Sequence, residues 1–156
     1  MKKYFICLAN SKKFRERCVA GIEVTKNNTG SFSIVEKGNR PKWIRPVTEY
    51  VHGAVPENIA GEMHLLDVYK IKITEECPEG YQSENVKFKR NSLKRISRIS
   101  HKSTNLDVLI ETSRDTIFTN RGKAVPKEKI KDVSYSLVLI KAVNPEVYQN
   151  NEFGKN

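Results

Sequence analysis

A cluster of basic and polar side chains near the N-terminus has the chemistry to bind an anion. Its members are Asn10, Ser11, Lys12, Lys13, Arg15 and Arg17. Arg and Lys carry the charge and the donor geometry that suit phosphate, and Asn and Ser supply hydrogen bonds where a chain leaves a strand. Because small β domains often place their binding chemistry on loops between core strands, this pattern predicts an anion-binding loop. The alternative is a solvated loop whose cations keep the protein soluble.

Residues later in the chain add to this candidate site. Four residues are expected to converge on one groove: Ser11, Lys12, Arg17 and Arg45. Aromatic rings stack nucleic-acid bases in such grooves, and the candidates are Phe14, Trp43 and Tyr81, although Trp43 could instead anchor the core. The segment around Tyr81 adds the polar side chains of Gln82 and Asn85. Alternatively, Arg17 and Arg45 brace the fold by pairing with carboxylates, for which the candidates are Glu16, Asp67 and Glu84.

A basic block separates the two halves of the chain. Residues 86–102 contain seven Lys or Arg and no acid, whereas residues 49–84 contain eight acids and two Lys. Leu93, Ile96 and Ile99 recur at every third position, which predicts a helix over residues 91–100 with one apolar stripe. We expect this helix to project its cations into solvent, where they would contact a polyanion: Lys94, Arg95 and Arg98.

Catalytic and metal-binding patterns are not found in the sequence. The nucleophile candidates are Ser11 and Cys18, but no hydrolase, zinc-protease, Walker or Rossmann motif accompanies them. The three cysteines form no C-x-x-C pair, so we expect no metal and no cofactor. Cys7 and Cys18 lie in apolar strand-like runs and are predicted to be buried, reduced thiols. We therefore expect a binding protein with no catalytic residues.

Composition narrows the class of partner. The 156 residues carry a net charge of +10, and the mean hydropathy is -0.57. No apolar run approaches the roughly 20 residues of a membrane span, and no signal peptide is recognisable, so a cytoplasmic location without membrane contact is expected. A basic chain with one concentrated basic block favours a polyanion partner, and nucleic acid is the first candidate.

Strand-like segments dominate the chain and would position these residues. The predicted strands cover residues 4–9, 18–25, 31–36, 43–47, 65–73, 106–111, 116–119 and 136–143, and a short helical turn is expected at 126–131. Many short strands separated by Gly and Pro turns are typical of barrels and sandwiches. The pattern splits at the basic block, which predicts an all-β fold with one or two short helices and two small barrels in tandem. A single PUA-like or SH3-like barrel with extensions is the alternative.

Several blocks resemble the dual OB domain family of bacteria. The first three are Leu8-Ala9-Asn10-Ser11-Lys12, Arg17-Cys18-Val19-Ala20-Gly21 and Trp43-Ile44-Arg45-Pro46-Val47. The later ones are Leu66-Asp67-Val68, Tyr81-Gln82-Ser83-Glu84-Asn85 and Ser136-Leu137-Val138-Leu139-Ile140, so the resemblance runs from residue 4 to about residue 143. The resemblance implies two tandem OB-like barrels, which we place at residues 1–85 and 86–145, the second opening with the basic helix, followed by a polar tail at 146–156.

The same resemblance implies a function. OB folds bind oligonucleotides in many proteins, so a non-catalytic module that binds single-stranded DNA or RNA is expected, and some family members are suspected of acting in bacterial defence or conflict systems. Two alternatives stay open, a sensor of a small anionic ligand such as a nucleotide and an adaptor for a protein encoded by a neighbouring gene. A hydrolase is less favoured by the residues present.

Overall fold

The computed structural model of the chain describes residues 1–13, 15–49, 53–99, 106–111, 116–118, 120 and 124–146. The strands are β1 (Lys2–Lys13), β2 (Glu16–Lys26), β3 (Phe32–Ile34), β4 (Trp43–Val47), β5 (Val55–Pro56), β6 (Asp67–Glu76), β7 (Asn85–Phe88) and β8 (Lys94–Arg98). The helices are α1 (Glu57–Ala60) and three 3-10 turns, η1 (Arg90–Ser92), η2 (Leu106–Leu109) and η3 (Lys127–Asp132). The predicted fold class, mainly β with short helices, is confirmed.

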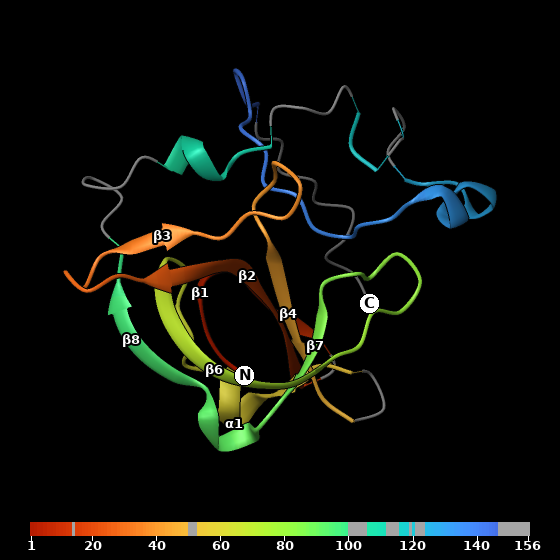
Figure 1. The fold of residues 1–156 in the computed structure, drawn as a ribbon. Coiled ribbons are helices and arrows are strands. Elements are labelled where there is room, and N and C mark those ends of the chain that lie inside the picture. The colour runs from red at the N-terminus through yellow and green to blue at the C-terminus, as the bar shows by residue number, and fades with distance from the viewer. Residues whose placement is uncertain are drawn as a thin grey trace.

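Five strands close into a ring in the order β1–β2–β4–β7–β6, and β6 pairs back with β1. β4 and β7 run parallel, and the other neighbours in the ring run antiparallel. β3 and β5 pair with β2, and β8 pairs with β6. Figure 1 shows the ring, with α1 beneath it and later segments of the chain above it. The ring is a small closed barrel, in which each strand has one inward and one outward face.

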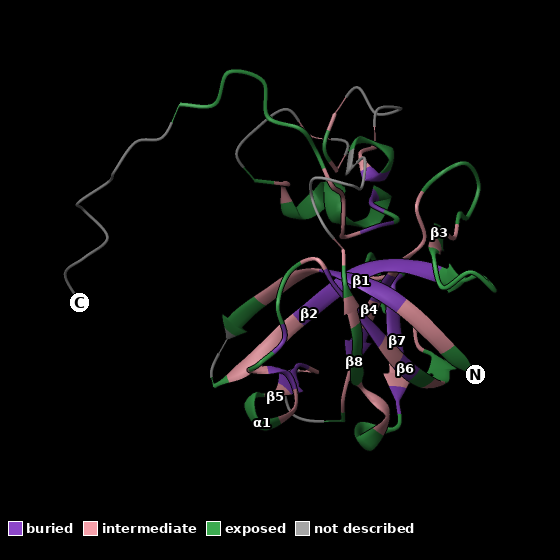
Figure 2. Cartoon of the chain, turned by 90° about the vertical axis from the view of Figure 1, so that its left-hand side faces the viewer, coloured by how far each residue is buried: buried purple, intermediate pink, exposed green. Residues whose placement is uncertain are grey.

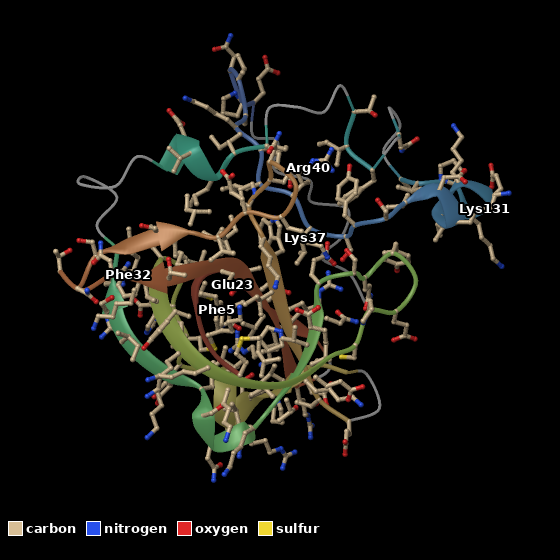
Figure 3. The ribbon with its side chains drawn as sticks, in the orientation of Figure 1. Phe5, Glu23, Phe32, Lys37, Arg40 and Lys131 are labelled. Carbon is tan, nitrogen blue, oxygen red and sulfur yellow. The ribbon has the colours of Figure 1, made fainter. Side chains whose placement is uncertain are left out.

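The barrel interior holds the larger of two hydrophobic clusters, because one face of each strand points inward. Phe5, Val19, Ile44 and Ile71 belong to one buried cluster inside it. Figure 3 labels Phe5 within the ring and, close by, Glu23, which is only 2% exposed. Lys3 and Lys42 both pair with Glu23, so this buried carboxylate keeps two ammonium partners.

Gly21 lets β1 and β2 approach closely. The pairing of β1 with β2 shifts register between Cys7 and Ala9, opposite Gly21, which marks a β-bulge. A Cβ atom at position 21 would lie 1.9 Å from the carbonyl oxygen of Ile6 and 2.7 Å from a ring carbon of Phe5. The bulge and the close approach coincide at Gly21, where no side chain fits.

The later segments pack together above the barrel (Figure 2). Leu109, Val133 and Tyr135 are buried. The ring centroids of Tyr135 and Phe118 lie 5.1 Å apart, and the backbone N–H of Glu111 donates to the carbonyl of Leu139 over 3.1 Å. No helix in the described ranges is long and apolar enough to cross a membrane.

The helix predicted over residues 91–100 is wrong. Residues 94–98 form β8, which pairs antiparallel with β6. Val68 pairs with Ser97 and Tyr69 with Arg95, so Ile96 is an extra residue in a β-bulge. The three apolar residues do not share one face: Leu93 packs on the cluster that contains Phe5, Ile99 packs on the cluster of Ile6, Val24 and Val68, and Ile96 is 38% exposed.

Three other local predictions also differ from the structure. Residues 10–13 are part of β1 rather than a loop, so the polar cluster lies on a hairpin in which Lys13 pairs with Glu16. Residues 106–109 form η2 instead of a strand. Residues 136–143 adopt no regular structure: residues 136–139 are half-buried and residues 140–143 are exposed, including Ile140 and Val143. The turn predicted at 126–131 is present as η3.

The pairing of β7 and β8 bears on the domain organisation. Both strands join the sheet formed by the strands that precede them. The division into units at 1–85, 86–145 and 146–156 stays a prediction. The ring of β1, β2, β4, β6 and β7 is the unit that positions the candidate site.

Candidate nucleic-acid interface

A cleft of about 880 Å³ lies over the outer face of β2, β4 and β7. Val19, Ile44 and Val86 point into the core, so the residues on either side of them point outward. The outward residues that line the cleft are Cys18, Ala20, Arg45, Val47, Asn85 and Lys87, and β1 adds Ala9 and Ser11. Alternation along three neighbouring strands therefore builds a surface with small side chains on β2 and polar ones on β4 and β7.

The loop between β6 and β7 forms one wall of the cleft. Glu79 and Gln82 exchange backbone hydrogen bonds that close the turn. Tyr81 at its tip is 40% exposed, so its ring is available for contact. Asn85 is 4% exposed and donates through Nδ2 to Oε1 of Gln82 over 3.1 Å. The wall therefore combines one accessible ring with amide groups that hold each other in place.

Arg45 is held by the chain that crosses above it. Its Nη2 donates to Oγ of Ser136 over 2.7 Å. Ser136 in turn donates through its backbone N–H and its Oγ to the two oxygens of Glu84, each over 2.9 Å. Glu84 is 8% exposed. The predicted pairing of Arg45 with Glu84 is thus indirect, through Ser136, and Arg45 still lines the cleft.

The charges at the cleft are mixed. Arg45 and Lys87 line it together with Glu49 and Glu79. Lys87 lies 3.0 Å from an oxygen of Glu75, and this hydrogen bond raises the pKa of Lys87. The cleft therefore offers separate positive points rather than a uniformly positive surface.

Two residues predicted for the same groove lie elsewhere. Arg17 donates through Nε and Nη2 to the two oxygens of Glu57, over 2.7 and 2.6 Å. These bonds raise the pKa of Arg17 and lower that of Glu57. Lys12 is exposed opposite Arg17 on the hairpin. The structure therefore brings Ser11 and Arg45 together in the cleft, whereas Arg17 braces β2 against α1.

The remaining hairpin residues have different settings. Asn10 donates through Nδ2 to the carbonyls of Ala60 and Met63, over 3.0 and 2.7 Å, and so fixes the end of α1 to β1. Arg15 is exposed at the turn, with a φ of 65°. The side chain of Lys13 and all of Phe14 lie outside the described residues.

The cations of β8 also separate into two kinds. Arg95 donates through Nε to Oδ2 of Asp67 over 2.6 Å, and a nitrogen of Arg98 lies 3.8 Å from Oδ1. Asp67 is fully buried. Lys94 is exposed and forms no ion pair among the described residues. Two of the three cations predicted to contact a polyanion are therefore close to a buried carboxylate of the barrel.

Trp43 lines a neighbouring cleft of about 280 Å³. This second cleft lies between β4, the 37–42 loop and the segment around Tyr135. Trp43 is half-buried, and its Nε1 has no hydrogen-bond partner among the described residues. Figure 3 shows Lys37 and Arg40 on that loop, below the later segments of the chain.

The two cysteines predicted to be buried differ. Cys7 is fully buried, and burial raises its pKa to about 11. The prediction is wrong for Cys18, which is half-buried and lines the cleft, as Cys77 does. Cys18 lies on the outward face of β2, and the apolar run around it concealed this in the sequence. All three are free thiols.

Comparison with known families agrees with this architecture. A family model for the dual OB-containing domain matches residues 3–156. The chain belongs to this family. No curated protein and no solved structure matches it. OB barrels have five strands, and they bind oligonucleotides on the face of their second and third strands and on the loops that join strands one to two and four to five.

These OB positions can be located in the ring. Its second and third strands are β2 and β4, and the loop between its fourth and fifth strands is residues 77–84, between β6 and β7. The cleft therefore occupies the face that OB barrels use for ligands. Five of the residues that line it were predicted from the sequence: Ser11, Arg45, Tyr81, Gln82 and Asn85. Cys18 and Lys87 were missed, because their only signal was an outward position in the strand alternation.

Proposed function

We propose that this OB protein binds single-stranded nucleic acid, DNA or RNA, in the cleft over β2 and β4. The observation that carries the proposal is the position of the cleft on the ligand face of an OB barrel. Five polar or aromatic residues converge there: Ser11, Arg45, Tyr81, Gln82 and Asn85. The module acts by binding, without catalysis.

Each group has a defined part in this proposal. Arg45 contacts a backbone phosphate, because its guanidinium uses one nitrogen on Ser136 and has further donors. Tyr81 offers its exposed ring as a platform for one base, and such stacking contributes about 1–3 kcal/mol per base. Gln82 and Asn85 carry amide groups that line the cleft, and we expect Gln82, supported by Asn85, to contact base edges and so to favour some sequences over others.

A protein-interaction adaptor is the second candidate. Glu49 and Glu79 line the cleft beside Arg45 and Lys87, and a surface with both signs of charge suits a protein partner. The partner would be encoded by a neighbouring gene, and the same mixed cleft would admit a small anionic ligand. A role in a bacterial defence or conflict system stays a prediction from the family.

Binding of a fluorescent single strand tests the proposal. The probes are oligo-dT and oligo-U of about 12 nucleotides, within the range covered by one OB fold, titrated at several salt concentrations. We expect binding that weakens as salt rises, since phosphate contacts release counterions. Tyr81→Ala should weaken binding about tenfold or more by loss of stacking, whereas Tyr81→Phe retains the ring and the affinity.

Arg45→Ala should also weaken binding and lower the dependence on salt. Arg17→Ala is the matched control, because Arg17 is paired with Glu57 outside the cleft. The melting temperature of each variant shows whether the barrel is intact. Equal affinity of Arg45→Ala, Tyr81→Ala and the unmodified protein would refute the proposal, and salt-insensitive binding to a protein partner would favour the adaptor.

A further inference from the structure

Four lysines gather on a part of the barrel that the proposed function does not use. Lys2, Lys70, Lys72 and Lys94 line a shallow groove of about 340 Å³ across β1, β6 and β8. We call these four residues the lysine face. None of the residues that line this groove lines the cleft over β2 and β4. The two surfaces can therefore be altered independently.

Strand pairing places these lysines side by side. Lys2 is directly opposite Lys72, and Lys70 is directly opposite Lys94. Directly opposed residues of antiparallel strands point to the same face, with their Cβ atoms about 4.5–5.5 Å apart. Ile71, between Lys70 and Lys72, is fully buried in the core, so the lysines point outward.

No carboxylate compensates these charges within the described part of the chain. None of the four lysines forms an ion pair there, whereas Lys3 and Lys42 share the buried Glu23. The ammonium group of Lys2 lies 5.9 Å from the ring centroid of Tyr4, a cation–π contact that leaves its charge in place. Like charges directly opposite each other destabilise a sheet, so the arrangement has a cost.

Protection of a sheet edge explains only part of this pattern. Lysines on edge strands prevent pairing with other chains, and Lys94 lies on β8, which pairs only with β6 among the described strands. Lys70 and Lys72 lie on β6, which has β1 on one side and β7 and β8 on the other. Edge protection therefore gives no reason for lysines at 70 and 72.

We infer that the lysine face is a second nucleic-acid site, which binds the backbone phosphates of a duplex or of a strand without reading its bases. Lysines act as point charges toward phosphate. The one other polar side chain in the groove, Ser92, is already occupied, because its Oγ accepts from the backbone N–H of Lys72 and donates to the carbonyl of Lys89. The face thus supplies charge without a means of base recognition.

A DNA duplex of about 20 base pairs tests this site separately from the cleft, because a duplex presents charge but no unstacked bases. The test variant carries Lys→Gln at positions 2, 70, 72 and 94. The matched control carries Lys→Gln at positions 26, 127, 129 and 131, which are exposed and outside the groove. Lys131, for example, projects from η3, well apart from the barrel (Figure 3). Both variants lower the net charge of +10 by four, to +6.

We expect the lysine-face variant to lose duplex binding steeply. The slope of log K against log salt should fall by about 0.9 for each phosphate that the protein no longer neutralises, and so by up to about 3–4. The control should keep the slope, and Lys→Arg at the same four positions should restore it. Equal slopes for the lysine-face variant and the control, or no duplex binding by the unmodified protein, would overturn the inference.

The two proposals fail in different ways. The lysine-face variant should still bind the short single strand, and Tyr81→Ala should still bind the duplex. Loss of single-strand binding only in the cleft variants supports the proposed function alone. Loss of duplex binding only in the lysine-face variant supports the second site alone. Melting curves identify any variant that has lost its fold, and the Lys70→Gln, Lys72→Gln pair then serves as the milder test.

Discussion

The cleft over β2 and β4 and the lysine face across β1, β6 and β8 belong to one barrel but differ in how their charges are held. In the cleft, Arg45 is joined through Ser136 to the buried Glu84, and Lys87 pairs with Glu75. On the lysine face, opposed lysines have no carboxylate partner among the described residues. Whether a positive charge is available to a ligand therefore depends on the acids next to it. The number of cations in the sequence does not decide this.

The largest effect is expected when Glu84, the buried acid that holds Arg45 through Ser136, is removed. Glu84→Ala should lower the free energy of unfolding by about 3 kcal/mol, because two hydrogen bonds to a buried charged acceptor are lost. The segment around Ser136 should then detach from the barrel and become accessible to proteases. Urea unfolding and limited proteolysis with mass spectrometry measure the two effects.

Glu79→Ala is the control for that experiment. Glu79 lies on the same wall of the cleft but is exposed, so its replacement should change stability by less than about 0.5 kcal/mol. If Glu84→Ala were as stable as Glu79→Ala, the link from Glu84 through Ser136 to Arg45 would not contribute to the fold, and the contrast between the two surfaces would disappear.

A smaller effect of opposite sign is expected on the lysine face. The double change Lys70→Gln, Lys94→Gln should raise the free energy of unfolding by about 0.5 kcal/mol, because it removes a pair of like charges directly opposite each other. The gain should shrink at high salt, where exposed charges are screened. Urea unfolding at low and high salt measures both, with Lys127→Gln, Lys129→Gln as the control. A loss of stability would show that these lysines support the sheet.

The smallest expected effect is a difference in thiol reactivity between the cleft and the core, which requires no mutation. At about pH 8 a thiol reagent should modify Cys18 and Cys77, which line the cleft, and leave Cys7 unmodified. Burial raises the pKa of Cys7 to about 11, so its reactive thiolate is scarce at that pH. Mass spectrometry of peptides identifies the modified sites. Modification of Cys7 in the folded protein would mean that the barrel opens, and bound oligonucleotide should slow the reaction at Cys18.

The strands of the ring could be predicted because their apolar residues alternate or form short runs. Residues 4–9, 18–25, 43–47 and 65–73 all fall largely within β1, β2, β4 and β6. The prediction of a helix in the basic block was wrong because the regular spacing of Leu93, Ile96 and Ile99 does not correspond to a shared face: two of them pack on different clusters and Ile96 is exposed. The run from 136 to 143 resembled a buried strand, but its first half is half-buried and its second half is exposed. The spacing of apolar residues in a sequence indicates which residues can be buried. It does not show which element packs against them.

The candidate site could be predicted only in part. Arg45, Tyr81, Gln82 and Asn85 could be predicted because they lie in two sequence blocks that the family resemblance had marked. The partner of Arg45 was not, since Ser136 lies 91 positions away in the sequence. Arg95 is paired and Lys94 is not because Asp67 is buried beside Arg95. This burial exists only in the folded barrel, so the sequence does not reveal it.

The tight approach of the backbones at Gly21 has a consequence for how this chain can diverge. Every other amino acid carries a Cβ, and at position 21 that atom would meet the backbone of Ile6, which no change of side chain elsewhere can remove. Three positions earlier on the same strand, Cys18 faces the cleft and is half-buried. A change at position 18 reshapes the cleft while the barrel stays closed. The same strand thus combines a position that tolerates no substitution with one at which ligand preference can evolve.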